Sequence, residues 1–553
     1  MIEIKKKTKL LYVCLMAIAL QSCQERMETE ESPLQSQESQ SGQIKLGEKW
    51  ELPYSLRNVQ AAYDSLMAEN PLRSGGHEQL QATHYYVRFL PKDSAEMAEL
   101  LMDTTLFLSD FPWDRDIEGD GGESYHDPSL DNTIFTWQYT RVPIDYQFTN
   151  IKYEILDEMC ILPEFELTEE SEEDDDETEE GDVEYVLRSS QAQSFAKQLQ
   201  MASLRRAGYV SGNCTNDTIP LRSWLSNALK KLNPTWTPKA TIKAWDDLLG
   251  RYIPLEGVKV YINHGGVWCY RHTDEDGHVK FPRCVGPVVY KIEWSDTYWR
   301  IFEGDCLPAY YSRSGSNRST WNLNISGGKS LHYACIHRGA RRHFYGDNCG
   351  IERPRFPYHK ISYIYRDDSG DYRAAWNYLG GNAVPDIRIY GLESNKMKET
   401  DLVTKTAMHE LAHASHCQSV GILTYSLCSD YIKEAWTVAV AYYMMKKEYE
   451  ELRASQTHLE YIKEQYAYQR YYTKRIYSPL IVDLIDDENE MYTINGNCPN
   501  DPITGYSLKT IQKCLKGVTT VSDFKSNIKE NTPRGVTDRK IDMFFKTFED
   551  RWN

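Results

Sequence analysis

One stretch of the sequence decides how the rest of the chain is interpreted: Thr406-Ala407-Met408-His409-Glu410-Leu411-Ala412-His413-Ala414-Ser415-His416. His409 and His413 are four residues apart, so on a helix they lie on one face and can bind one metal ion. Glu410 follows His409 directly and can reach a water molecule on that ion without binding the ion itself. The stretch therefore predicts a metal site with a carboxylate base beside it.

The same stretch has the pattern of a helix. Val403, Ala407, Leu411 and Ala414 form an apolar stripe that faces away from the histidines. Asp401 can cap the start of this helix, because a side-chain oxygen there accepts a hydrogen bond from a free backbone N–H. We expect a helix with one apolar face for packing and one face for the metal ion.

The His-Glu-x-x-His spacing resembles the metal helix of the zincin metallopeptidases. By that resemblance the ion is Zn²⁺, His409 and His413 are its ligands, and Glu410 is the general base. A zinc ion held in this way lowers the pKa of its bound water to near neutrality and polarises a carbonyl group. The resemblance implies hydrolysis of peptide bonds.

A third ligand must come from elsewhere in the chain, because a catalytic zinc keeps three protein ligands and one open position. In the metzincins it is a histidine six residues after the second motif histidine, but Ser419 stands there. The pattern is more similar to the gluzincins, whose ligand is a glutamate on the next helix, and Glu434 has that spacing. His416 and Asp430 are alternative ligands. The chain departs from the thermolysin-like form, which has an aspartate where Val438 stands.

Two other parts of such a site lie outside the motif. In zincins an edge strand before the metal helix pairs with extended substrate, so Ile387 to Tyr390 is the candidate for binding the substrate backbone. The alternative is a strand in the interior of a sheet. A tyrosine or histidine that stabilises the oxyanion should lie downstream. The candidates are Tyr442, Tyr443, His458, Tyr472 and Tyr477.

Other groups of possible metal ligands have simpler interpretations. His332, His337 and His343 could form a second site, but their irregular spacing favours surface or cleft positions. Asp274 and Asp276 lie in a turn sequence and are more typical of turn chemistry. The acidic run of residues 166–184 lacks the glycine turn and ligand spacing of an EF-hand, so it predicts a solvated loop.

The overall charge disfavours one class of partner. The 553 residues include 81 acidic and 63 basic side chains, for a formal net charge of −18. Nucleic-acid binding requires basic patches, so it is not expected. Much of the acidic charge lies in the run 166–184 and says little about the rest of the surface.

The N-terminus resembles a bacterial lipoprotein signal. A basic start that includes Lys5 and Lys9 is followed by a short apolar core, Leu10 to Leu20, and by Leu20-Gln21-Ser22-Cys23, which resembles a lipobox. The resemblance implies a mature protein that begins with a lipidated Cys23. We expect it in the cell envelope, tethered to the outer membrane or exposed at the cell surface. The alternative is an ordinary secretory signal in which Cys23 is incidental.

Cysteine usage gives a weaker indication. Removal of Cys14 and lipidation of Cys23 would leave 11 of the 13 cysteines, and export favours some disulfides. Pairing cannot be deduced from sequence. A bond between Cys417 and Cys428, across the loop that joins the two expected ligand helices, is one candidate.

A change to period-two alternation near residue 238 indicates a β-sandwich. Val258 to Ile262 and Val288 to Trp294 are strand-like, and the Asp276-Gly277 pair suits a tight turn. The pattern resembles the prealbumin-like sandwich of carboxypeptidase regulatory domains. The resemblance implies a structural or adhesive module without catalytic residues.

The fold class that we expect is multidomain α+β, with an α+β accessory domain, a small sandwich and a mainly helical zincin-like domain. The boundaries follow changes in composition and periodicity. They are 1–22 for the signal, 23–49 for a disordered tether, 50–237 for the accessory domain, 238–304 for the sandwich and 305–553 for the catalytic domain.

The function that these features predict is a zinc-dependent peptidase anchored by lipid to a bacterial envelope. Its partners would be a peptide or protein substrate and, through the N-terminal lipid, the membrane. The alternative is a surface binding or adhesion lipoprotein in which the zincin-like domain is structural or vestigial.

Overall fold

The computed structural model describes residues 42–68, 79–130, 135–165, 195–196, 198–209, 235–315, 318–354, 358–368, 370–372, 386–468, 478–487 and 503–548. The expected signal segment, Cys23 and the acidic run 166–184 lie outside these residues. Within them no helix is both long enough and apolar enough to cross a membrane. The chain contains helices and several sheets, so it is a mixed α and β protein, as the sequence predicts.

The N-terminal part is built on a three-stranded antiparallel sheet in the order β4-β2-β5. Its strands are β2 (His84–Leu90), β4 (Gln138–Pro143) and β5 (Lys152–Met159), and its helices are α2 (Leu56–Ala68) and α3 (Ser94–Met102). Val87 and Phe89 of β2 pack with Leu100 of α3 because alternate residues of a strand share a face. The sequence of residues 84–90 predicts a strand and that of residues 94–102 predicts a helix, and both predictions are confirmed.

Two predictions for this part are wrong. The expected tether extends to residue 49, but β1 (Leu46–Lys49) pairs with β3 (Arg115–Ile117), and the nearby Ile44 is buried in an apolar cluster. The sequence of residues 105–108 also predicts a strand, but these residues form irregular chain. The polar composition of the first segment did not reveal its order, because Leu46 pairs with Ile117, a residue far away in the sequence.

The middle part consists of two sheets that share one apolar core. The first has the order β10-β9-β13-β16 and the second has the order β11-β7-β17, with β8 beside β7. Alternate residues such as Ile242, Val260 and Ile292 face inward into this core. The strands are β7 (Lys239–Asp246), β8 (Arg251–Pro254), β9 (Lys259–His264), β10 (Val267–His272), β11 (His278–Lys280), β13 (Val289–Glu293), β16 (Tyr310–Ser314) and β17 (Trp321–Ile325). A short pair, β6 (Thr235–Trp236) and β12 (Cys284–Val285), lies beside them.

A third sheet carries the elements that precede the metal helix. Its order is β15-β14-β18-β20-β19, with β21 also paired to β20, and β14, β18 and β20 run parallel. The strands are β14 (Trp299–Glu303), β15 (Leu307–Pro308), β18 (His359–Asp367), β19 (Asp371–Tyr372), β20 (Ile387–Glu393) and β21 (Lys396–Met397). The chain therefore does not change units at residue 304: β14 belongs to this third sheet, whereas β16 and β17 return to the sandwich.

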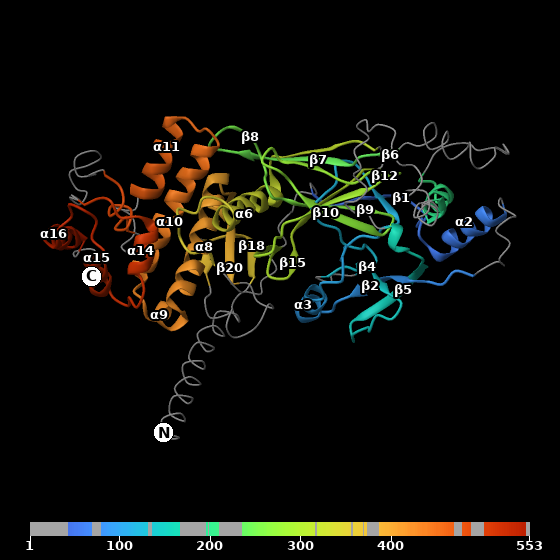
Figure 1. The fold of residues 1–553 in the computed structure, drawn as a ribbon, viewed down its shortest axis with the longest axis horizontal. Helices are drawn as coiled ribbons and strands as arrows, with labels where there is room; N and C mark the ends of the chain where they lie inside the picture. The colour runs from blue at the N-terminus through green and yellow to red at the C-terminus, as the bar shows by residue number, and fades with distance from the viewer. Residues whose placement is uncertain are drawn as a thin grey trace, which may run out of the picture. The chain divides into compact units, whose positions relative to one another are not determined.

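Helices α6 (Gly328–Phe344), α8 (Thr400–Val420) and α10 (Asp430–Glu451) pack side by side in that order next to the third sheet (Figure 1). Gly339 lets α6 approach α8 closely, since a Cβ atom there would lie 2.8 Å from the Cβ of Ala407. Val403, Ala407 and Leu411 of α8 reach the same core as Ile387 and Ile389 of β20. The predicted apolar stripe of the metal helix is thus confirmed.

The C-terminal part is helical and has its own core. Trp436, Val440 and Met444 of α10 pack there against Ile511 and Phe545. The further elements are α9 (Ile422–Leu427), α11 (Gln456–Lys463), a π-helical turn η5 (Glu464–Tyr468), α14 (Leu508–Cys514), α15 (Val521–Glu530) and α16 (Asp538–Phe548). The described residues from Gly42 onward belong to one compact unit.

Candidate metal centre

The two motif histidines lie on the face of α8 that is turned toward α10. The opposite face is fixed in the apolar core, so His409 and His413 are both held in buried positions four residues apart. The helix begins at Thr400, one residue before the expected cap Asp401. Thr400 exchanges two hydrogen bonds with Asp247: its N–H donates to Oδ2 at 2.9 Å, and its Oγ1 accepts from the Asp247 N–H at 2.7 Å.

The third predicted ligand, Glu434, lies in the first turns of α10 and meets the histidines. Its Oε2 atom is 3.2 Å from Nε2 of His409, and its Oε1 atom is 3.4 Å from Nε2 of His413. One ligand atom from each of the three side chains lies within 4.8 Å of the other two. The three residues that the spacing argument selected therefore lie together in the structure.

The two alternative ligands lie elsewhere. Asp430 is largely exposed and forms an ion pair with Lys433 at 2.6 Å. His416 is fully buried, and its ring packs edge-on against Tyr425 and Trp436. Burial also lowers the pKa of His416 to about 3, so its ring is neutral.

The geometry of the three side chains fits a zinc ion. Zn–N and Zn–O distances of about 2.0–2.2 Å in a tetrahedral site place neighbouring ligand atoms about 3.4 Å apart. The separations of 3.2 and 3.4 Å between the Glu434 oxygens and the histidine nitrogens agree with that spacing. Two imidazoles and one carboxylate are also a common donor set of catalytic zinc.

Electrostatics within the group favour a negative Glu434. Burial acts to raise the pKa of this carboxyl, but the charge of His413 and hydrogen bonds from both histidines hold it well below its usual value. Burial lowers the pKa of His409 to about 4 in spite of Glu434. Burial also acts on His413, but there the charge of Glu434 prevails and the pKa is raised.

Two tyrosines orient His413. The hydroxyl of Tyr425, on α9, lies 2.9 Å from Nδ1 of His413, which leaves Nε2 to face Glu434. The ring of Tyr372, on β19, stacks on the imidazole with an interplanar angle of 6°. An outer partner of this kind fixes the orientation of a metal ligand. Neither tyrosine is recognisable from spacing in a chain with 39 tyrosines.

The neighbour of His409 on α10 is Thr437, one residue before the position expected from the thermolysin-like form. Thr437 Oγ1 lies 3.2 Å from Nε2 of His409 and 3.1 Å from the backbone oxygen of Glu434. Val438, at the expected position, is buried. The threonine thus links the two ligand helices next to the group.

The general-base candidate Glu410 is buried beside Gly370, in the turn between β18 and β19. A Cβ atom added at Gly370 would lie 2.2 Å from Oε1 of Glu410 and 2.9 Å from Cγ2 of Thr406. Only a glycine lets the backbone of this turn approach the carboxylate so closely. The turn and the helix together therefore define where Glu410 points.

The strand predicted to bind substrate is not an edge strand. β20 pairs with β18 on one side and with β19 and β21 on the other. Ile387 and Tyr390 are both buried. The premise for these two residues is wrong because β19, a two-residue strand without a recognisable pattern, occupies the position next to β20.

The remaining predictions for the site have mixed outcomes. Tyr472 and Tyr477 lie outside the described residues, and Tyr442 packs into the core of the C-terminal helices. The upstream histidines are buried on α6 and not at the surface. His332, His337 and His343 contact the backbone oxygens of Lys398, Glu256 and Met408, each at 2.9 Å, so they support packing.

The predicted bond between Cys417 and Cys428 is also wrong, since both thiols are free. Burial raises the pKa of each to about 11, which keeps them protonated and unreactive. Asp274 behaves as predicted for a turn, because its Oδ1 accepts the backbone N–H groups of Asp276 and His278 at 3.0 and 2.8 Å.

A scan against models of known protein families and a search of curated proteins found no match to this chain.

Proposed function

We propose that this protein is a zinc-dependent peptidase of the gluzincin type. The observation that supports this proposal most is the convergence of His409, His413 and Glu434 from two helices at distances suited to zinc, with Glu410 one residue away. A buried carboxylate that is not itself in the ligand group is what a general base requires.

In this proposal each side chain has a defined task. A bound zinc ion would acidify a water molecule and polarise the substrate carbonyl. Glu410 accepts the proton of the attacking water and later delivers a proton to the leaving amine. Tyr425 holds His413 in the orientation that presents Nε2, and Gly370 keeps the turn next to Glu410 open.

In this proposal the strand that pairs with the substrate backbone is β19 and not β20. β19 is the last strand in the described order of its sheet, and Tyr372 on this strand stacks on His413. A peptide added beside β19 would run past Glu410 and the ligand group. Backbone hydrogen bonds would then hold the substrate, as in other cases of strand addition.

The same proposal places the protein in a bacterial envelope, anchored through Cys23. The apolar segment before Cys23 and the polar segment after it support this location. We also propose that the two sheets of the middle part form a prealbumin-like module and that the third sheet and its helices form a zincin-like domain. Mass spectrometry of the mature N-terminus would test the lipid directly.

The experiment that tests the activity compares Glu410→Gln with the unchanged protein on a library of peptides. We expect Glu410→Gln to retain one zinc ion per chain but to lose cleavage by about a thousandfold or more, because the base is removed and the ligands remain. Glu460→Gln, an exposed site on α11, is the matched control and should cleave normally.

Two results would contradict the proposal. Cleavage that survives in Glu410→Gln would exclude the proposed base. Purified protein without stoichiometric zinc, measured by elemental analysis after addition of the metal, would instead favour a non-catalytic surface binding protein.

A further inference from the structure

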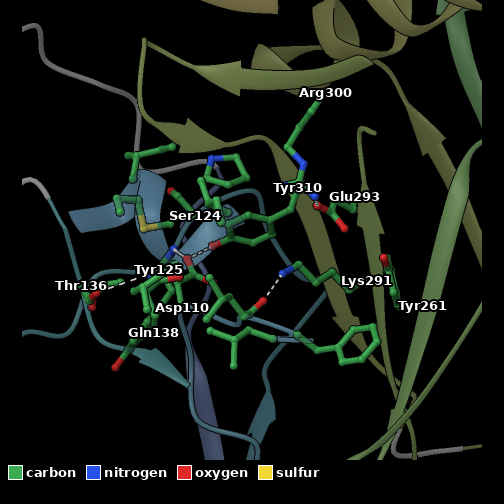
Figure 2. A pocket seen from close by; sticks show the side chains of 18 of the residues that line it. Asp110, Ser124, Tyr125, Thr136, Gln138, Tyr261, Lys291, Glu293, Arg300 and Tyr310 are labelled. Carbon is green, nitrogen blue, oxygen red and sulfur yellow. Dashed lines mark hydrogen bonds and ion pairs between the residues drawn. The ribbon is translucent and has the colours of Figure 1, made fainter. Parts of the chain in front are cut away.

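A second site lies away from the metal centre, in a cavity of about 480 Å³ between the N-terminal part and one sheet of the sandwich (Figure 2). One wall is the sheet β10-β9-β13-β16, together with Arg300 of β14. The other wall comes from the segments around Phe107, Asp110 and Tyr125. A cavity of this size can enclose a ligand of one or two sugar rings.

Strand register explains which side chains face this cavity. Tyr261 pairs with Tyr270 on one side and with Lys291 on the other, and Lys259 pairs with Glu293. Directly paired residues share a face of the sheet. The opposite face, with Val260, Ile262 and Ile292, is the core of the sandwich. Charged and aromatic residues thus occupy the face that the N-terminal part covers.

Four of the carboxylates in the cavity wall have partners within the protein. Glu293 pairs with Arg300 at 2.9 Å, and Glu303 pairs with Lys329 at 2.5 Å. Asp110 accepts hydrogen bonds from the Tyr310 hydroxyl and, at 3.2 Å, from the Tyr125 N–H. Glu123 accepts the backbone N–H of Ser330 at 3.1 Å.

The two lysines in the wall are different. Lys259 lies over the ring of Tyr270 at 4.5 Å, and Lys291 donates to the backbone oxygen of Leu108 at 2.9 Å. Among the described residues neither ammonium group has a carboxylate within ion-pair distance. As diagonal neighbours on β9 and β13, their Cβ atoms are about 7 Å apart, so a single anionic group can bridge them.

The two lysines lie among charges of both signs in the cavity wall. Burial lowers the pKa of Lys291 and of Lys259, whereas the charge of Glu293, and for Lys291 also that of Asp110, acts to raise it. These acids compensate the lysines only in part, because none of them is in direct contact with either ammonium group. A ligand carboxylate between the two lysines would give both a direct partner.

We propose that this cavity binds an acidic sugar, with its carboxylate between Lys259 and Lys291 and its ring against Tyr261 and Tyr270. Gln138, Thr136 and Glu293 in the wall offer partners for sugar hydroxyls (Figure 2). An aromatic acid would leave such polar groups unpaired. A phosphate would bring a second negative charge close to Asp110 and Glu293.

The test is calorimetric titration of the full chain with D-glucuronate, compared with D-glucose, benzoate and inorganic phosphate. Glucuronate should bind at least about tenfold more tightly than each of the other three. Lys259→Met and Lys291→Met should each weaken binding about tenfold or more. Lys243→Met, on the other sheet of the sandwich, should leave it unchanged.

A melting experiment separates a binding role from a structural one. If the two lysines serve a ligand, Lys259→Met and Lys291→Met should melt at the same temperature as the unchanged protein or a few degrees higher. The proposal is overturned if glucuronate does not bind, if glucose, benzoate or phosphate binds equally well, or if the lysine variants bind normally. It is also overturned if Glu410→Gln loses glucuronate binding, since the ligand would then occupy the metal centre.

Discussion

Gly370 shows how one residue without a side chain can control the position of the proposed base, Glu410. A methyl group at this position would lie 2.2 Å from Oε1 of Glu410, closer than any normal contact. Gly370→Ala should therefore push the carboxylate aside, and we expect kcat for peptide cleavage to fall about a hundredfold because such misplacement is costly. Zinc content should stay at one ion per chain, since the ligands are untouched.

The control for this variant is Gly327→Ala. A Cβ atom at Gly327 meets open space, so activity there should be normal. Kinetics and elemental analysis on the same samples distinguish the outcomes. Normal cleavage by Gly370→Ala would mean that the position of Glu410 beside this turn is irrelevant to the reaction.

The three residues that lie together could be predicted from the sequence, whereas the residues that support them could not. His409 and His413 follow from one helical repeat, and Glu434 follows from the spacing to the next helix. Tyr425 reaches His413 only because a short helix turns back between the two ligand helices. A contact of that kind depends on tertiary packing and leaves no periodic signal.

Glu123 should make the stability of the protein depend on pH. Burial and the charge of the nearby Glu303 together raise the pKa of this carboxyl to about 7, although Lys329 acts to lower it. Between about pH 4.5 and pH 7 the folded state keeps a proton that the unfolded state has released, so stability falls as the pH rises. The loss is roughly 3.5 kcal/mol at most, because each of the about 2.5 pKa units of the shift corresponds to about 1.4 kcal/mol.

Glu123→Gln should remove this part of the pH dependence. Urea unfolding at about pH 5 and about pH 8 measures the free energy of unfolding of the variant and of the unchanged protein. The variant should gain stability relative to the unchanged protein at the higher pH. Glu118→Gln, an exposed neighbour, is the control. Parallel pH curves for Glu123→Gln and the unchanged protein would contradict the assignment.

Among the elements, α6 connects the two sheets of the middle part to the helices α8 and α10. Arg338 of this helix donates to Asp246 of β7 at 2.9 Å and to Glu448 of α10 at 3.3 Å. Asp246 is fully buried and also accepts the hydroxyl of Tyr449 at 2.9 Å. Neither partner of Arg338 could be predicted from the sequence, because both lie on other elements and α6 itself contains no acidic residue.

Arg338→Met should be strongly destabilising. It leaves the charge of Asp246 buried without its cation, and a buried ion pair that loses one partner costs about 3–5 kcal/mol. Arg341→Met is the matched control, since its partner Glu256 is half exposed and such pairs contribute about 1 kcal/mol or less. Denaturant unfolding of both variants measures the difference. Equal losses of unfolding free energy in the two variants would show that the buried ion pair stabilises the protein no more than the exposed one.

The strands illustrate a different limit of sequence-based prediction. The apolar run of β20 correctly indicated a strand, because Ile387 and Ile389 alternate into the core. Its neighbours were unpredictable, since β19 pairs through only two residues that carry no strand pattern of their own. Periodicity identifies which face of a strand is buried but not which strands lie beside it.

For the whole molecule, the predicted boundary at residue 304 cuts through a continuous core. Ile242 and Val260 of the sandwich belong to the same apolar cluster as Ile301 and Ile361 of the third sheet and Leu411 of α8. Alternation changed at about the right place, but β14 precedes the boundary and pairs with β18 beyond it. A change of pattern marks a change of element type and need not mark the end of a folding unit.

A fragment of residues 305–553 should therefore fail to fold on its own. It lacks β14, which lies between β15 and β18 in the third sheet, and it lacks Asp246, the buried partner of Arg338. The apolar residues that pack against residues 240–301 in the intact protein would be exposed in this fragment. We therefore expect aggregation or a collapsed state without cooperative unfolding. A fragment that starts at residue 235 retains both features and should unfold in one cooperative transition with bound zinc.

Circular dichroism and calorimetry on the two fragments compare them directly. Cooperative unfolding of the shorter fragment would show that the sandwich and the metal-binding part are independent domains, and the shared core would then be an interface.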